Sequence, residues 1–384
     1  MSQYIFIEPH DVLILRGNKL FGAAGSYGES QVLPWPSVVA GAIRSALLAE
    51  SGHDFEAFAA GTAEHPQLGT PQQPGAFRLL ALGLARHRAE GVEMLRPLPA
   101  DLFVPKGKGE QKLHEIQRLQ PTPLAPGMAG SAKLPRVAAL QRDATTKPEQ
   151  GIWLTEAGWN DHLDGKLPAS QTLVASKALW KIDERIGVGL NAATGAAHDS
   201  ALFTTQAVAF RDNVGLLAAI DGIDTLPATG TLRLGGDGRA ARYQSIERNN
   251  PLPDLAAIAQ ARCCRLILTT PGLFEHGWLP PGITMGTDGY HFDLHGVRAR
   301  LICAAVARAE VISGWDLAAR QPKPAQRAAP IGSVYWLNDL DADEAALRKL
   351  ATECLWPEQG YDAVRRAEGF NRCAIAAWKQ GTEA

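Results

Sequence analysis

The chain has 384 residues, of which 46% are hydrophobic, and a formal net charge of −2 at pH 7. This length supplies ample material for buried cores and predicts two or three domains. A charge so near zero excludes a protein that coats nucleic acid by bulk charge, so any phosphate binding must come from local segregation of charge.

Charge is segregated along the chain. Residues 86–147 hold eleven Lys and Arg against six Asp and Glu, and residues 298–327 hold six against two. Residues 338–358 show the opposite balance, two against six. Such imbalances fit contact with a polyanion, but many solvated faces have them as well.

The five cysteines are an odd number without a Cys-x-x-Cys pair. This usage predicts small buried side chains in a reducing compartment. The N-terminus lacks the basic segment and apolar run of a signal peptide, and no window reaches the roughly 18 uncharged apolar residues of a membrane helix. We therefore expect a soluble, cytoplasmic protein without membrane contact.

The first 50 residues predict a strand, a loop and a helix. Residues 4–8 are rich in β-branched and aromatic side chains, which is typical of a strand. A turn with two cations follows at 16–19, and residues 22–29 form a glycine-rich loop. Pro36 then opens a helix. This order fits the first half of a split βαβ unit, the ferredoxin-like layout.

One face of that helix is a candidate phosphate site. Ser37, Gly41 and Arg44 recur at helical spacing and therefore share a face. A helix start offers free N–H groups to an anion, and the mid-helix glycine predicts close packing of another group at that point. The alternative is an amphipathic core helix with an exposed arginine and with Ser37 as its cap.

Residues 96–150 change character, with recurring prolines, clustered cations and weak periodicity. A long irregular stretch inside a compact protein is usually a functional insertion or a disordered segment. Its positive balance favours a projecting hairpin or arm that reaches a polyanion.

The middle of the chain predicts further strands. The Gly-x-Gly at 187–189 lacks the third glycine and the following helix of a dinucleotide site, and we reject that reading. Residues 202–210 and 214–220 are strand-like and predict a hairpin through a turn at 211–213. Residues 235–239 predict a tight glycine turn.

The second half repeats this mixture. Residues 265–270 and 332–337 predict strands, and residues 341–355 predict a helix with acids in its first turn. Residues 298–311 fit a strand or a helix; we favour a strand because residues 311–313 and the turn at Gly314 close it off. A last strand is expected at 375–378. Two α+β domains of similar plan follow from this order.

The sequence contains no H-E-x-x-H, G-x-S-x-G or P-loop motif. His291 and His295 are four residues apart, but flanking glycines indicate a loop and no third ligand is nearby, so we expect no metal. We also expect no cofactor and no catalytic residues. Only His10 and His198 are candidates for acid–base cleavage of RNA.

Several segments resemble a known family. Residues 7–21 read Ile-Glu-Pro-His-Asp-Val-Leu-Ile-Leu-Arg-Gly-Asn-Lys-Leu-Phe, and residues 33–47 read Leu-Pro-Trp-Pro-Ser-Val-Val-Ala-Gly-Ala-Ile-Arg-Ser-Ala-Leu. With 185–203, 234–239, 312–316, 331–335 and 368–370, they resemble the third subunit of Cmr-type (type III-B) CRISPR effector complexes, in the RAMP superfamily. The insertion at 96–150 and the last six residues carry little of this likeness.

The resemblance implies a non-catalytic protein of two ferredoxin-like (RRM-like, split βαβ) domains, residues 1–200 and 201–384. The first would carry the long basic, proline-rich insertion, with the family's projecting thumb in or near 96–150. Such a subunit holds the 5′ repeat-derived tag of the guide RNA and bridges the backbone RAMP subunits to the large signalling, polymerase-like subunit. It meets target RNA only indirectly.

The resemblance and the residues together predict an RNA site. Cations and backbone N–H groups would hold phosphates, and Phe21 would stack on a splayed base. The family's glycine-rich loop usually reads Gly-Phe-Gly, whereas residues 369–371 read Gly-Phe-Asn; asparagine tolerates the left-handed conformation that such a turn needs. The expected RNA-binding residues are Arg16, Asn18, Lys19, Phe21, Ser37, Gly41, Arg44, Arg185, Arg239, Gly369 and Phe370.

Two other functions remain open. A metal-independent endoribonuclease would cut repeat RNA through His10 or His198. A protein adaptor would contact neighbouring subunits and never touch RNA.

Overall fold

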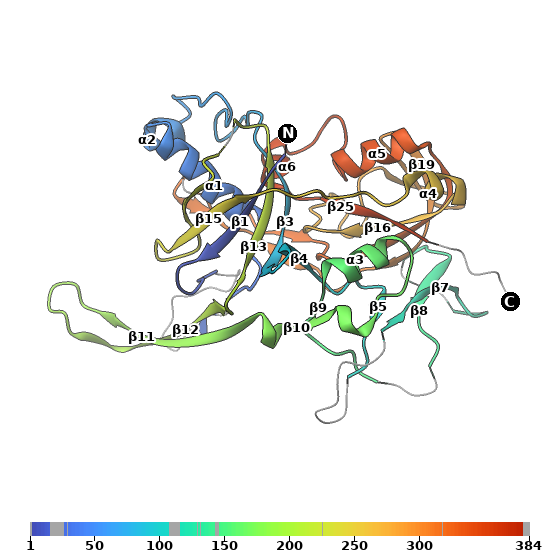
Figure 1. Cartoon of the computed structure of the whole chain (residues 1–384), viewed down its shortest axis with the longest axis horizontal. Coiled ribbons are helices and arrows are strands. Elements are labelled where there is room, and N and C mark those ends of the chain that lie inside the picture. Colours follow the sequence, from blue (N-terminus) through green and yellow to red (C-terminus); the bar gives the residue numbers. More distant parts are fainter. Residues whose placement is uncertain are drawn as a thin grey trace.

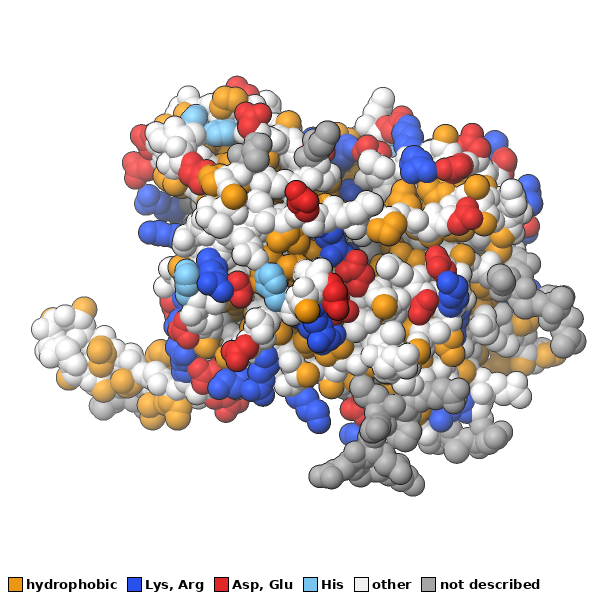
Figure 2. Space-filling view, in the orientation of Figure 1, with side chains coloured by type: hydrophobic (Ala, Val, Ile, Leu, Met, Phe, Trp, Pro, Cys, Tyr) orange, Lys and Arg blue, Asp and Glu red, His pale blue; other side chains and the backbone are white. Residues whose placement is uncertain are grey.

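The fold is seen in a computed structural model. It describes residues 2–15, 27–28, 30–106, 116–128, 130, 132–142, 146–224, 226–316 and 318–378, with only the backbone of 27–28 and 198–201. The molecule contains two large, mainly antiparallel sheets with helices beside them (Figure 1; Figure 2 shows the surface in the same orientation), which confirms the α+β class. No helix in these ranges is long and apolar enough to cross a membrane.

The first sheet has eight strands. Edge to edge they are β10 (Leu173–Ala175), β9 (Ile152–Leu154), β4 (Gly91–Pro97), β3 (Arg78–Arg88), β13 (Val214–Asp221), β1 (Gln3–Pro9), β15 (Ala240–Ile246) and β14 (Thr229–Arg233). Every neighbouring pair in it is antiparallel. Four of its strands, β1, β3, β13 and β15, taken in chain order as first to fourth, lie side by side in the order second, third, first, fourth.

The second sheet has six strands. They are β17 (Ile283–Gly286), β18 (Gly289–Leu294), β19 (Val297–Ala305), β24 (Val334–Asp341), β16 (Cys264–Leu268) and β25 (Cys373–Ala377). Strands β16, β19, β24 and β25 again lie in the order second, third, first, fourth. The chain leaves the first sheet at residue 246 and enters the second at residue 264. The domain boundary expected at 200/201 falls inside strand β12 (Ala197–Phe210), which belongs to neither of these two sheets.

Six helices pack on these sheets within the described ranges. They are α1 (Pro36–Glu50), α2 (Phe55–Ala59), α3 (Glu156–Leu163), α4 (Leu255–Ala261), α5 (Glu344–Glu353) and α6 (Ala363–Glu368). The apolar stripe of α1 packs Val39 and Ile43 against Ile5 and Ile7 of β1, all fully buried. The predicted helix at 341–355 is α5, with Leu347 in the second core.

The described residues of the stretch 96–150 pack against the body of the protein, whereas a projecting hairpin or arm was predicted there. They form two short pairs, β5 (Leu102–Phe103) with β6 (Gln117–Arg118) and β7 (Gln120–Pro123) with β8 (Arg136–Ala139). Strand β8 lies beside β19, and Leu134 packs against the core of the second sheet. Apolar side chains within this stretch therefore hold its described part against the body of the protein.

The projecting hairpin lies later in the chain. It consists of β11 (Trp180–Leu190) and β12 (Ala197–Phe210) and extends away from the body in Figure 1. The short β2 (Tyr27–Gly28) pairs in parallel with β12. The predicted hairpin between 202–210 and 214–220 is wrong, because β12 pairs with β11 while β13 pairs with β1 and β3.

A buried charge cluster ties the stretch after β4 to the second sheet. Asp101 accepts a hydrogen bond from Arg265 of β16, and His162 of α3 places its Nε2 3.1 Å from Asp101 Oδ1. Arg118 Nη2 lies 3.2 Å from His162 Nδ1. Burial lowers the pKa of His162, while the neighbouring Asp101 carboxylate acts in the opposite direction.

The remaining described elements complete the second half. Small pairs join β20 (Glu310–Ile312) to β23 (Gln326–Ala328) and β21 (Trp315–Asp316) to β22 (Gln321–Pro322). Two 3₁₀ turns, η1 (Ser170–Thr172) and η2 (Ser176–Ala178), flank β10. All five cysteines are buried and none forms a disulfide, in agreement with the prediction from their number and spacing.

Candidate nucleic-acid interface

The hairpin of β11 and β12 has two faces of different chemistry. Successive side chains of a strand point to opposite faces. Ile186 and Leu202 lie on one face and are 79% and 60% exposed. Arg185 lies on the other, where a Cβ at Gly187 would stand 2.3 Å from the Phe203 ring, so only glycine fits beneath that ring. Aliphatic side chains therefore cover one face of the hairpin, and a cation and an aromatic ring lie on the other.

Two of the predicted arginines meet at the base of this hairpin. Arg239 donates a hydrogen bond to Asp11, and Arg185 Nη2 lies 4.0 Å from the same carboxylate and 2.9 Å from Asp183. The hydrogen bond from the Val12 backbone, helped by Arg239, keeps the pKa of Asp11 below its usual value although burial acts in the opposite direction. Arg239 therefore pairs with Asp11 rather than with the neighbouring Asp237.

The surrounding backbone fixes this cluster. Residues 11–15 run beside β12 through a bridge between Leu13 and Val208, and Gly236 N donates to Ile14 O at 2.8 Å. Gly235 and Gly238 have φ of 86° and 64°, as the tight turn before Arg239 requires. This segment leads directly into residue 16. Arg16, Asn18, Lys19 and Phe21 themselves lie outside the described residues.

The second group of predicted residues lies on α1. Its N-cap is Trp35, without a side-chain hydrogen bond, and no acid stands in the first turn. Ser37 therefore does not cap this helix, and the N–H groups of its first turn have no side-chain partner among the described residues. Among the described residues nothing lies within 4 Å of a Cβ at Gly41, so the close packing predicted at this glycine does not come from a described part of the chain.

Arg44 is a partly buried cation. Its guanidinium lies over the Phe77 ring, 5.3 Å from the ring centre. Burial lowers the pKa of Arg44, while the charge of Glu368 on α6 acts in the opposite direction. The side chain is thus held between the start of β3 and α6, and does not extend freely into solvent.

The third group is structural. Phe370 is fully buried in a cluster with Trp35 and Trp356, so its ring is not available to RNA in this structure. Gly369 has φ of 91°, and a Cβ there would lie 2.7 Å from the Leu79 carbonyl oxygen of β3. The loop joins the two halves of the molecule.

Asn371 adopts the left-handed conformation that this turn needs. Its φ is 58°, as predicted for asparagine in place of the usual glycine. Its side chain accepts a hydrogen bond from Leu273 N at 2.6 Å and donates to Leu273 O at 3.3 Å. The amide therefore fastens this loop to the segment that follows β16.

Sequence reasoning missed the hairpin and Asp11. The period-two pattern of Ile182, Glu184, Ile186 and Val188 was a visible signal for a two-faced strand. Asp11 carried no local signal, because its partners lie far along the chain.

The histidines have ordinary partners. Within the described ranges, no three His, Cys, Asp or Glu side chains are grouped as a metal site would need. His291 Nε2 lies 2.7 Å from Asp288, and His295 Nε2 lies 3.2 Å from the Cys354 carbonyl. The side chain of His198 is outside the described residues.

Comparison with known proteins identifies the family. Among curated proteins none matches this sequence. Among solved structures, a chain of a type III-B Cmr-beta complex, bound to cognate target RNA and AMPPNP, aligns with a TM-score of 0.50 and 13% identity, covering 97% of this chain and 98% of that one. A second Cmr-beta complex with cognate target RNA aligns at 0.43 and 13% identity over 96% of each chain.

The first of these structures supports the fold alone, because its sequence identity to this chain is low. The model of the family described as CRISPR-associated protein (Cas_Cmr3) matches residues 5–378, from the first strand of the first sheet to the end of the last strand of the second. The chain therefore belongs to the Cas_Cmr3 family of CRISPR-associated proteins.

Proposed function

We propose that this chain is a non-catalytic, RNA-binding subunit of a cytoplasmic type III-B CRISPR effector complex. It holds the 5′ repeat-derived tag of the guide RNA and bridges the backbone subunits to the large subunit. In this proposal each sheet, with its helix, is one ferredoxin-like domain, and target RNA is met indirectly.

The observation that carries the proposal is the meeting of Arg185 and Arg239 at the base of a projecting hairpin. Arg185 is 40% exposed, so its guanidinium remains open to a second anion beside its acidic partners. Guanidinium groups bind phosphate through two parallel N–H donors. The phosphates of a short single strand are then held where residues 11–15 lead into the glycine-rich segment.

The hairpin supports the same role. The face that carries Arg185 also carries Phe203, and a ring beside a cation suits single-stranded RNA, whose bases stack on aromatic side chains. The first turn of α1 and Gly41, beside whose Cβ position no described residue lies, offer a further approach for a phosphate. We place the tag along these surfaces.

Sequencing the RNA that copurifies with the tagged chain from its host tests this proposal. Guide RNAs sharing one 5′ handle are expected with the unaltered chain. The double variant Arg185→Ala, Arg239→Ala should retain about tenfold less of them, because two phosphate contacts are lost. The matched control is Arg242→Ala, which removes an exposed cation of β15 that pairs with Glu8 at 2.9 Å.

The outcomes separate the three functions. Equal loss in the double variant and the control would indicate a general charge effect and contradict the proposed tag site. Partner proteins without enriched RNA would indicate the adaptor instead. Cleavage of repeat RNA by the purified chain in EDTA, abolished by His10→Ala or His198→Ala, would indicate the endoribonuclease.

A further inference from the structure

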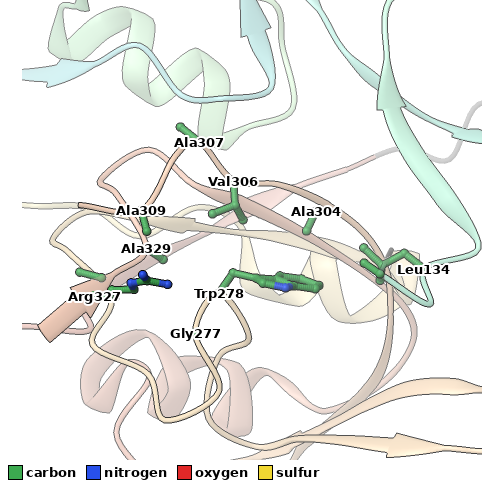
Figure 3. Close-up of a pocket in the computed structure, with 11 residues that line it drawn as sticks. Leu134, Gly277, Trp278, Ala304, Val306, Ala307, Ala309, Arg327 and Ala329 are labelled. Atoms are coloured by element: carbon green, nitrogen blue, oxygen red, sulfur yellow. The ribbon is translucent and has the colours of Figure 1, made fainter. Parts of the chain in front are cut away.

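A pocket on the second half of the molecule is separate from the hairpin and from α1. Its volume is about 430 Å³. Figure 3 shows Trp278 with its indole in the pocket, the Arg327 guanidinium directed toward that indole, and Ala304, Val306 and Ala309 opposite. Leu134 closes one end of the pocket. One guanidinium thus lies among apolar walls.

The pocket arises from chain segments that the sheet brings together. Ala304 stands near the end of β19, and the chain then turns outward before β20. Arg327 lies in β23, and Trp278 lies in the loop before β17, where its backbone carbonyl accepts a hydrogen bond from Tyr335 at 2.8 Å. Tyr290 contacts the Trp278 ring edge-to-face, with 6.2 Å between ring centres. Tyr335 therefore fixes the backbone of Trp278, and Tyr290 packs against its ring.

The charged side chain that lines the pocket is a cation, and cations outnumber acids among the chain neighbours of its lining residues. Arg327 has no hydrogen bond or ion pair from its side chain within the described part of the chain, and the same holds for Lys133 and Arg308, whose chain neighbours line the pocket. Glu310 is the single acid next in the chain to a lining residue. The lining cation Arg327, with two cations against one acid beside lining residues in the chain, favours an acidic partner.

The lining also decides between a protein and a nucleic acid. Apart from Arg327, every lining side chain is apolar or absent. A nucleobase can stack on Trp278, but the donors and acceptors around its ring would lose water here and find few side-chain partners besides Arg327, which is unfavourable. An aliphatic or aromatic protein side chain loses no hydrogen bond on entering such walls.

We propose that this pocket is a docking site for a protein partner that inserts a bulky apolar side chain and places a carboxylate against Arg327. The inference rests on the proposed membership of a multi-subunit complex, which supplies such a partner. Tryptophan and arginine are the side chains that most often dominate binding energy at the centre of protein interfaces, and both stand here on a rigid support.

Site-specific photocrosslinking in the whole complex tests this docking site. p-Benzoylphenylalanine is placed at Ala307, and in a second sample at Arg308, and the complex is purified through this chain and irradiated. The expected product is a crosslink to another protein chain, at an apolar residue with Asp or Glu within a few positions. Mass spectrometry identifies the crosslinked peptide.

A matched pair of variants reports on the chemistry. Arg327→Ala is expected to lower the crosslink yield about tenfold, as for loss of an interface hot spot. The control Arg348→Ala removes an exposed arginine of α5 that pairs with Glu344 at 2.6 Å, and should leave the yield unchanged. Copurifying RNA is measured in the same samples, so failure of the proposed function is seen separately.

Three results would overturn the docking site. One is a crosslink to RNA at either position. Another is the absence of any crosslink to a second protein from complexes that retain their RNA. The last is an equal crosslink yield from the p-benzoylphenylalanine chain with Arg327→Ala and from the same chain with Arg327 in place.

Discussion

The two sheets of this protein share one strand order but place their helices in different halves of the unit. In the first, α1 connects β1 to β3, and the later pair β13 and β15 is joined without a helix. In the second, α5 and α6 connect β24 to β25, and the earlier pair β16 and β19 is joined through β17 and β18. Each sheet therefore has one helical connection and one connection without a helix between these pairs of strands.

The same connection is enlarged in both sheets. Residues 89–213 join β3 to β13 in the first sheet, and residues 306–333 join β19 to β24 in the second. The first enlargement supplies the hairpin and Asp101, and the second supplies Arg327. Because a connection at the surface tolerates added length, new surfaces arise there without altering the order of the strands.

The largest expected effect concerns the join between the halves. Asp101→Ala leaves Arg265 buried and uncompensated, and should lower the free energy of unfolding by about 3–5 kcal/mol. Urea unfolding measures it. Two separate transitions in this variant would show that the halves fold as independent units. Asp164→Ala, at an exposed pair with Lys166, should change stability by about 1 kcal/mol or less.

A smaller effect distinguishes two glycines of the second half. Gly369 and Gly360 both have positive φ, 91° and 69°, but only at Gly369 would a Cβ collide with another strand. Gly360→Ala should cost about 1–2 kcal/mol through backbone strain alone. Gly369→Ala should cost at least about 1 kcal/mol more, since Leu79 must move. Equal shifts in Tm would contradict the tight contact between the halves.

The smallest effect has the opposite sign. Gly41→Ala should raise the free energy of unfolding by about 0.5–1 kcal/mol, because alanine favours the helix and no described residue stands near its Cβ. Gly158→Ala in α3 is the contrast, with a Cβ 2.4 Å from Thr172 Oγ1, and should destabilise. If Gly41→Ala is more stable but retains less guide RNA in the complex, a phosphate approaches the backbone there.

Local signals predicted the elements that depend on local chemistry. The stripe of α1 and the first-turn acid of α5 identified both helices, and residue types identified β1, β19 and β24. The left-handed turn at Asn371 was also predicted, because it depends on that residue alone.

Sequence patterns gave no indication of the contacts between residues that lie far apart in the chain. The turn at 211–213 read as a hairpin, yet Asn213, with φ of 63°, passes the chain from one sheet to another. Asp101 and Arg265 are 164 residues apart, and Phe370 is removed from RNA by packing against Trp35. Such partners are chosen by the tertiary fold, which neither periodicity nor propensity encodes.

The passage from β12 to β13 has a mechanical consequence. Only residues 211–213 separate the projecting hairpin from the middle of the eight-stranded sheet, and Arg211 N is fastened to Leu179 O at 2.9 Å. Because this linker is short and hydrogen-bonded, a sideways force on the tip of the hairpin is transmitted through residues 211–213. The load then reaches β13, which is hydrogen-bonded along both sides, and not a strand at the margin of the sheet.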